Sequence, residues 1–184
     1  MVNLVVEDGT GVTGANTYIS TASATTYCSN QYGPQNVFAA VATASPPNDQ
    51  ATALYSAAYA MERLFGRRYL SVMPFVSLQG LLWPRYTFLD NTYRLISMTQ
   101  IPQCLLDAQC ELALLYLNGT SLYPNESNNR LFRMLNVEVG SLSQKTTYWK
   151  IPQDVEHYDG FRKVELILYP ILESEDNRNA QLTL

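Results

Sequence analysis

The stretch from Ile101 to Gly119 constrains the fold of this chain more than any other part of the sequence. It reads as one helix, because Pro102 suits the first helical position and Gly119 suits the left-handed residue just past a helix end. On a helical wheel its polar residues share one narrow ridge, which consists of Gln103, Asp107, Glu111 and Asn118. Apolar residues cover most of the remaining circumference. We therefore expect this to be the central helix of a compact helical domain.

Two further helices are predicted before the central one. Ser20 is a natural N-cap for a short helix that extends to about Asn30. Asn48 or Asp49 caps a longer helix to about Phe65, whose apolar residues keep the i, i+3, i+4 spacing. This apolar face should pack on the central helix. The intervening residues 31–47, rich in Ala, Ser, Thr and Pro, read as a loop.

Three residues of the longer helix, Tyr55, Tyr59 and Glu62, lie off its apolar face. Two exposed tyrosines side by side are either an interface or a chance arrangement, and the sequence leaves both alternatives open.

Strand-like segments flank the helices. Val2 to Val6 is predicted as a short strand that pairs at an edge or with another subunit. Leu135 to Val139 and Lys145 to Trp149 are predicted as a hairpin with a loop of about five residues. Tyr148 and Trp149 would then lie on opposite faces of this ribbon, which needs something to cover it.

The predicted fold class is mainly α, a small helical bundle around a central buried helix, with a β-hairpin and extended N- and C-terminal segments. We expect a single domain at residues 1–172, with the hairpin at about 135–150, and an extended tail at residues 173–184 that ends in Leu182 and Leu184. Within the domain, Phe161 to Leu172 reads as a short apolar helix or an extended segment before Pro170.

Charge and composition narrow the classes of function. Only 15% of the 184 residues are charged, and a surface with so little charge suggests contact with other protein. The net charge of −4 gives the chain as a whole no attraction to nucleic acid or to an anionic membrane, although a local basic patch stays open. The start has no basic n-region and the chain has no apolar run of about 18 residues, so we expect a soluble protein that is not exported.

The most basic local sequence is Gly66-Arg67-Arg68-Tyr69, at the end of the longer helix. Cations there meet the negative end of the helix dipole and can form surface salt bridges. The alternative interpretation is contact with phosphate or with an acidic partner.

A glycine-rich segment, residues 9–14, matches the GxGxxG pattern of dinucleotide-binding folds. Two features oppose that interpretation. No helix opens at Gly14, and no acidic residue occurs between Asp8 and Asp49 to bind a ribose hydroxyl. We interpret the segment as a turn.

No catalytic, cofactor or metal site is predicted, and we do not expect an enzyme. The cysteines, Cys28, Cys104 and Cys110, form no CxxC pair and are interpreted as small buried hydrophobes. His157, the only histidine, lies in an acidic segment that reads as an exposed loop. Asp107 and Glu111 could be a carboxylate pair, but on a buried helix they more simply meet solvent or an arginine.

Three stretches, taken together and in this order, resemble a bacteriophage family. Val5 to Gly11 followed by Ala15 to Ser20 is similar to the VEDGTG and ANSYVS opening of those proteins. Leu82-Trp83-Pro84-Arg85 is the second stretch, and Ile101-Pro102 with Ala108 to Ala113 matches the IP and A-x-CELA helix. The family is that of phage head-tail connectors (adaptor or head-completion proteins), many of which carry the label DnaT-like single-stranded-DNA-binding protein.

This resemblance implies a structural virion protein without a cofactor. About twelve copies would form a homo-oligomeric ring between the capsid portal protein and the tail or tail-tube and nozzle proteins. Genomic double-stranded DNA would pass through the lumen without sequence-specific binding, and no membrane would take part. The protein would reside at the head-tail junction of the virion and in the host cytoplasm during assembly. The candidate interface residues are Arg67, Arg68, Tyr148, Trp149, Leu182 and Leu184.

The alternative is a single-stranded-DNA-binding module, as the DnaT-like label suggests. Such a module needs a basic groove interleaved with aromatic platforms. Arg67, Arg68, Tyr69 and Trp149 are the candidates, but 12 cations over 184 residues make a weak groove.

Overall fold

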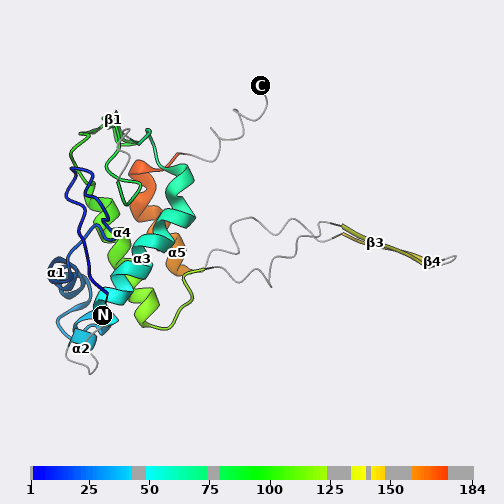
Figure 1. The fold of residues 1–184 in the computed structure, drawn as a ribbon. Coiled ribbons are helices and arrows are strands. Elements are labelled where there is room, and N and C mark those ends of the chain that lie inside the picture. Colours follow the sequence, from blue (N-terminus) through cyan, green and yellow to red (C-terminus); the bar gives the residue numbers. More distant parts are fainter. Residues whose placement is uncertain are drawn as a thin grey trace.

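A computed structural model gives the fold and describes residues 2–42, 49–73, 79–123, 134–139, 142–147 and 159–173 (Figure 1). The helices in chain order are α1 (Thr21–Tyr32), α2 (Val37–Ala42), α3 (Asp49–Phe65), α4 (Gln103–Leu117) and α5 (Asp159–Leu168). Short 3₁₀ turns follow α3 at Gly66–Arg68 (η1) and α5 at Tyr169–Ile171 (η4). The strands form two antiparallel pairs, β1 (Phe88–Leu89) with β2 (Leu95–Ile96) and β3 (Met134–Val139) with β4 (Leu142–Thr147). Each helix in these ranges is too short or too polar to cross a bilayer.

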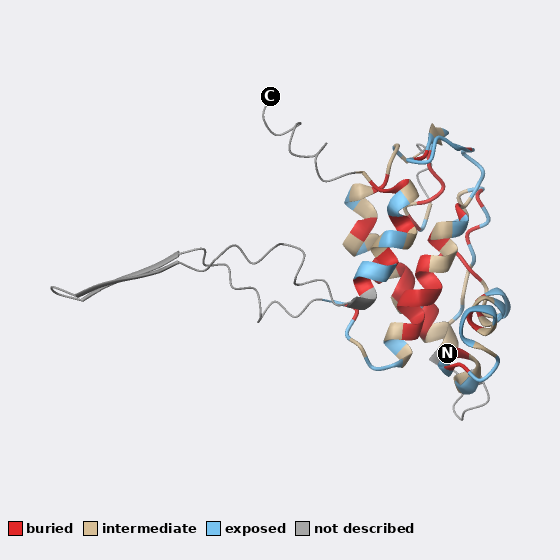
Figure 2. Cartoon of the chain, turned by 180° about the vertical axis from the view of Figure 1, so that it is seen from behind, coloured by how far each residue is buried: buried red, intermediate tan, exposed pale blue. Residues whose placement is uncertain are grey.

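Helix α4 is the centre of the bundle and packs against both α3 and α5. Figure 2 shows buried residues along most of its length. The fully buried side chains of this helix include those of Leu105, Ala108, Cys110, Leu112 and Ala113. The predicted central helix and the mainly α fold are therefore confirmed. Pro102 is the N-cap rather than the first helical residue, and Gly119 has the expected left-handed φ of 79°.

The other predicted helices are present with small shifts of their ends. Ser20 caps α1 by accepting a hydrogen bond from the Ser23 amide, and α1 continues to Tyr32. The apolar face of α3 packs on α4 as predicted, and its Leu54 and Met61 side chains are fully buried. Phe161 to Leu172 takes the helical alternative, as α5 and η4.

Helix α2 lies where the sequence predicted a loop, and that part of the prediction is wrong. Asn36 makes the short helix possible, because its side chain accepts a hydrogen bond from the Ala39 amide at 2.9 Å. Phe38 is fully buried and anchors α2 to the core. An N-cap followed by one buried aromatic residue is too short a signal to stand out by periodicity.

The sequence predicts Glu62 off the buried face of α3, yet residues from two other segments, Tyr18 and Leu82, contact its side chain. Its carboxylate accepts hydrogen bonds from the Tyr18 hydroxyl and, at 2.8 Å, from the Leu82 amide. Burial raises the pKa of Glu62 to about 7, against the opposing effect of these two hydrogen bonds. Beside it, the Trp83 side chain is fully buried in the core.

The glycine-rich segment is a turn closed by Glu7, which is only 2% exposed. One carboxylate oxygen accepts hydrogen bonds from the amides of Gly9 and Gly11, both at 2.9 Å, and the other accepts from Val12 at 2.8 Å. A carboxylate of the chain itself thus uses the amides that would hold a phosphate in a dinucleotide site. The interpretation as a turn is confirmed.

The N-terminal segment pairs within its own chain. Val6 forms one isolated parallel bridge with Thr17, and the Asn16 side chain accepts from the Val5 amide at 2.9 Å. The described residues 2–6 are therefore extended, with one bridge in place of the predicted strand.

The second strand pair confirms the predicted hairpin but corrects its loop. Val139 pairs with Leu142 and Met134 pairs with Thr147, so the strands are separated by residues 140–141 and not by five residues. Two-residue connections match the twist of antiparallel strands best, and the shorter loop lengthens the ladder. Tyr148, Trp149, His157, Leu182 and Leu184 lie outside the described residues.

Candidate functional site

The two predicted cations at the end of α3 have different surroundings. Arg67 is exposed. The Arg68 guanidinium instead forms an ion pair with Glu165 of α5 at 2.5 Å, and both side chains are mostly buried. Arg68 therefore follows the salt-bridge interpretation and holds η1 against α5. Tyr69, a candidate stacking platform, is only 2% exposed and packs edge-on against Trp83, so it offers no open ring face.

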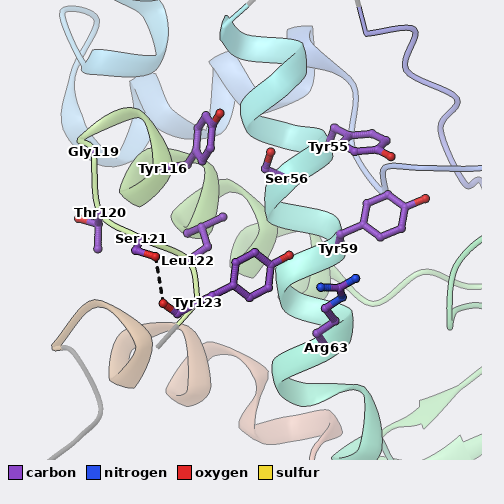
Figure 3. Close-up of a pocket in the computed structure, with 10 residues that line it drawn as sticks. All are labelled: Tyr55, Ser56, Tyr59, Arg63, Tyr116, Gly119, Thr120, Ser121, Leu122 and Tyr123. Atoms are coloured by element: carbon purple, nitrogen blue, oxygen red, sulfur yellow. Dashed lines mark hydrogen bonds between the residues drawn. The ribbon is translucent and has the colours of Figure 1, made fainter. Parts of the chain in front are cut away.

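An open groove of about 630 Å³ lies between α3 and the end of α4 with the segment that follows it. Figure 3 shows its lining residues, which come from two parts of the chain. From α3 come Tyr55, Ser56, Tyr59 and Arg63, and from the second segment come Tyr116, Gly119, Thr120, Ser121, Leu122 and Tyr123. Arg63 is the one charged residue among them.

Helical spacing puts the α3 side of the groove in order. Tyr55, Tyr59 and Arg63 are four residues apart, so they form one stripe along the helix. The rings of Tyr55 and Tyr59 have centroids 4.7 Å apart and are tilted by 45°. Burial raises the pKa of Tyr59, and Tyr55 beside it adds to the rise.

The opposite side depends on how α4 ends. The left-handed Gly119 turns the chain out of the helix, and the buried Leu122 fixes the segment that follows. The Ser121 hydroxyl donates to the Tyr123 carbonyl at 2.9 Å, drawn as a dashed line in Figure 3. The Tyr123 ring lies under Arg63, whose guanidinium carbon is 5.6 Å from the ring centroid.

Large parts of these rings are accessible. Tyr55, Tyr116 and Tyr123 are 37%, 38% and 44% exposed. The described residues of the groove thus offer several aromatic faces and one cation, and they include no carboxylate. The groove can bind flat, electron-rich or anionic groups by stacking and cation–π contact.

Glu111, expected to meet solvent or an arginine, lies on another side of α4 with different partners. Its oxygens accept hydrogen bonds from the hydroxyls of Tyr27 at 2.8 Å and Tyr32 at 2.6 Å, and pair with the Lys163 ammonium at 2.9 Å. Asp107 accepts from the Gln103 side chain at 2.8 Å instead. The two carboxylates therefore have separate partners.

Metal ligands do not gather in the part of the chain that the structure describes. Its residues include no group of three or more His, Cys, Asp or Glu side chains placed to hold an ion. The cysteines are free thiols, and Cys28 and Cys110 are fully buried, as predicted, while Cys104 is partly exposed.

Sequence reasoning identified the Tyr55 and Tyr59 pair but missed Arg63, Tyr116 and Tyr123. The stripe of Tyr55, Tyr59 and Arg63 at four-residue spacing was a readable signal. Tyr123 had none, because its position depends on how the chain folds back after Gly119.

One family model matches residues 2–183, and its description is "Putative DnaT-like ssDNA binding protein". No curated protein and no solved structure matches the chain.

This match corrects the main expectation about function. The main expectation is a structural protein that forms a connector ring in the virion, and the alternative is a module that binds single-stranded DNA. The matched family carries the alternative in its description and gives no support to a ring, so the connector function is withdrawn. The portal and tail partners, the homo-oligomer, the virion location and the absence of enzymatic activity are tested by neither the fold nor the match. Since the match spans residues 2–183 of 184, the chain belongs to the family described as "Putative DnaT-like ssDNA binding protein".

Proposed function

We propose that this protein binds single-stranded DNA in the groove between α3 and the end of α4, with bases stacked on its tyrosines. The observation that carries the proposal is the set of exposed rings of Tyr55, Tyr116 and Tyr123 around the cation Arg63. The family description points the same way.

Stacking explains why the strand must be single. Every base has a π-face, and a base stacked on an aromatic side chain contributes about 1–3 kcal/mol with little regard to sequence. In a duplex both faces of each base are already stacked on neighbouring pairs, so the tyrosines have no face to contact. The groove should therefore discriminate strongly against double-stranded DNA.

Charge supports only a minor part of the affinity. The chain has a net charge of −4, and Arg63 is the single cation among those lining residues of the groove that the structure describes. Arg67 is exposed in the η1 turn that directly follows α3, so it is the candidate for a second phosphate contact. Arg68 is engaged with Glu165 and is not expected to contribute.

The proposal is tested by fluorescence anisotropy with a labelled single-stranded oligonucleotide of about 16 nucleotides, near the upper site size of one binding fold. Tyr55→Ala and Tyr123→Ala should each raise the Kd about 5- to 150-fold, the equivalent of one lost base stack. Tyr93→Ala is the matched control, because Tyr93 is 88% exposed and outside the groove. The duplex of the same sequence should bind at least about tenfold more weakly.

The result that contradicts the proposal is equally specific. Wild-type protein that leaves the oligonucleotide unbound at low salt would exclude it. So would binding that Tyr93→Ala weakens as much as the groove variants do.

A further inference from the structure

A separate cavity of about 390 Å³ opens on another side of α4. It lies among the connection between α1 and α2, the last turns of α4, and α5. Apolar walls come from Val37, Leu114 and Leu115, and side-chain amides come from Gln35 and Asn118. Tyr32, Asn36, Glu111 and Lys163 complete the lining.

The charged groups at this cavity largely satisfy each other. Lys163 pairs with Glu111 at 2.9 Å, donates to the Tyr32 hydroxyl, and lies 4.9 Å from the centroid of the Tyr32 ring. Glu111 also accepts from the hydroxyl of Tyr27. A ligand therefore meets a compensated ion pair, and a net charge on the ligand gains little there.

The remaining chemistry suits a flat, neutral, hydrogen-bonding ring. The leucine and valine walls favour an apolar face, and Tyr32, 48% exposed, supplies an aromatic edge or face. An amide side chain has both donors and an acceptor, which is the combination that reads the edge of a nucleobase. The exposed amides of Gln35 and Asn118 are placed at the lining for that role.

The cavity adjoins the tyrosine groove through the last turn of α4. Leu115 and Asn118 line the cavity, whereas Tyr116 and Gly119, each one residue further on, line the groove. A helix with its side chains is about 10–12 Å across, so about three nucleotides cover the distance at the duplex spacing of 3.4 Å, and a more extended strand needs fewer. This turn is the negative end of the helix dipole. A phosphate is therefore disfavoured there, and an uncharged base is favoured over it.

We propose that the cavity binds one unpaired base of the strand held in the groove and gives the otherwise sequence-tolerant site a preference among bases. This inference rests on the proposed function. Hydrogen bonds from side-chain amides to a base edge distinguish a fitting base from the others by about 5- to 150-fold.

The test compares labelled homopolymeric oligonucleotides of dT, dC and dA, again about 16 nucleotides long. We expect wild-type protein to bind one of them at least about fivefold tighter than the weakest. Gln35→Ala combined with Asn118→Ala should reduce that ratio to about twofold or less. Neither side chain has a structural hydrogen bond among those described, so the thermal unfolding midpoint should stay unchanged. Gln103→Ala, an exposed amide at the other end of α4, is the matched control and should keep the wild-type ratio.

The outcomes separate this inference from the function on which it rests. Equal affinity of wild-type protein for all three homopolymers, with binding that Tyr55→Ala and Tyr123→Ala still weaken, overturns the base site and leaves the groove. If the variant with both Gln35→Ala and Asn118→Ala keeps the wild-type preference among the homopolymers, the base site is likewise overturned and the groove is left. A wild-type protein that binds none of the three overturns both.

Discussion

At the scale of single residues, Gln109 joins three segments of the bundle from within the core. Its side-chain oxygen accepts from the Tyr18 amide at 2.9 Å, and its nitrogen donates to the Thr17 hydroxyl and to the Leu54 carbonyl, both at 2.8 Å. The residue is fully buried, so none of these groups has water as an alternative partner.

We therefore expect Gln109→Leu to lower the free energy of unfolding by about 2 kcal/mol or more, since it leaves the buried Tyr18 amide without its partner and removes two further buried hydrogen bonds. Urea denaturation measures the change. Gln103→Leu is the control, because Gln103 is exposed and bonds only Asp107, and it should cost less than about 0.5 kcal/mol. Equal costs for the two variants would show that the polar contacts of Gln109 are unimportant.

Glu62 makes stability depend on pH. Its pKa is raised to about 7 in the folded protein, chiefly by burial, from an ordinary value of 4.5. Between those two pH values the folded state binds more protons than the unfolded state, so stability is full below the lower value and falls as pH rises. Within this window the free energy of unfolding should fall by up to about 1.4 kcal/mol per pH unit, and above it this dependence should vanish.

Glu62→Gln should remove that slope and leave a flatter profile from pH 5 to pH 8, measured by thermal or urea unfolding. The amide keeps an oxygen that can accept from the Leu82 N–H, and it carries no charge, like a protonated carboxyl group. A wild-type profile that is level across this range, or an unchanged slope in the variant, would contradict the assignment.

At the scale of elements, the turn at residues 7–12 needs glycine at one position for two reasons. Gly9 has a φ of 100°, and a Cβ atom there would lie 2.1 Å from the backbone oxygen of Thr99. Gly14 also has a positive φ, 73°, but a Cβ atom there would meet nothing within 4 Å. A comparison of alanine variants at Gly9 and Gly14 therefore separates the cost of backbone strain from the cost of a steric clash.

Gly9→Ala should destabilise the protein by more than about 2 kcal/mol, whereas Gly14→Ala should cost only the strain of about 1 kcal/mol. Thermal unfolding of both variants under one condition gives the comparison. If Gly14→Ala proves as costly as Gly9→Ala, the close approach of residues 9 and 99 does not contribute.

Elements with strong periodicity or a marked end could be predicted from the sequence. Helix α4 has apolar residues around most of its circumference and Gly119 at its end, and α3 has a clear apolar stripe. Helix α2 could not be predicted, because six residues give no period. The cover over Glu62 was also unpredictable, since it comes from residues 18 and 82, which the helical pattern of α3 cannot place.

The candidate site is less predictable than the fold, because it is formed by segments that are distant in the sequence and meet only after packing. Tyr55 and Tyr123 belong to different elements, and only the packing of α3 on α4 brings their segments together. A stripe along one helix can be read from the sequence, whereas a groove between two segments requires the packing. The basic pair at the end of α3, Arg67 and Arg68, is a clear candidate interface in the sequence, yet Arg68 forms an ion pair with Glu165.

At the scale of the whole molecule, the acidic balance sets how binding should respond to salt. Phosphate contacts release counterions, and for single strands each contributes about 0.7 to the slope of log K against log salt concentration. With Arg63 in the groove and the exposed Arg67 in η1, one or two phosphate contacts predict a slope between about −0.7 and −1.4. Base stacking does not depend on salt in this way, so most of the affinity should persist at high salt.

Arg63→Ala should therefore make the slope shallower by about 0.7, while Arg94→Ala, another exposed arginine that lies outside the groove, should leave it unchanged. Anisotropy titrations at several salt concentrations with one oligonucleotide measure both. A wild-type slope steeper than about −3 would mean four or more phosphate contacts. The described lining of the groove has too few cations for that, so such a slope would place the main DNA-binding surface elsewhere on the chain.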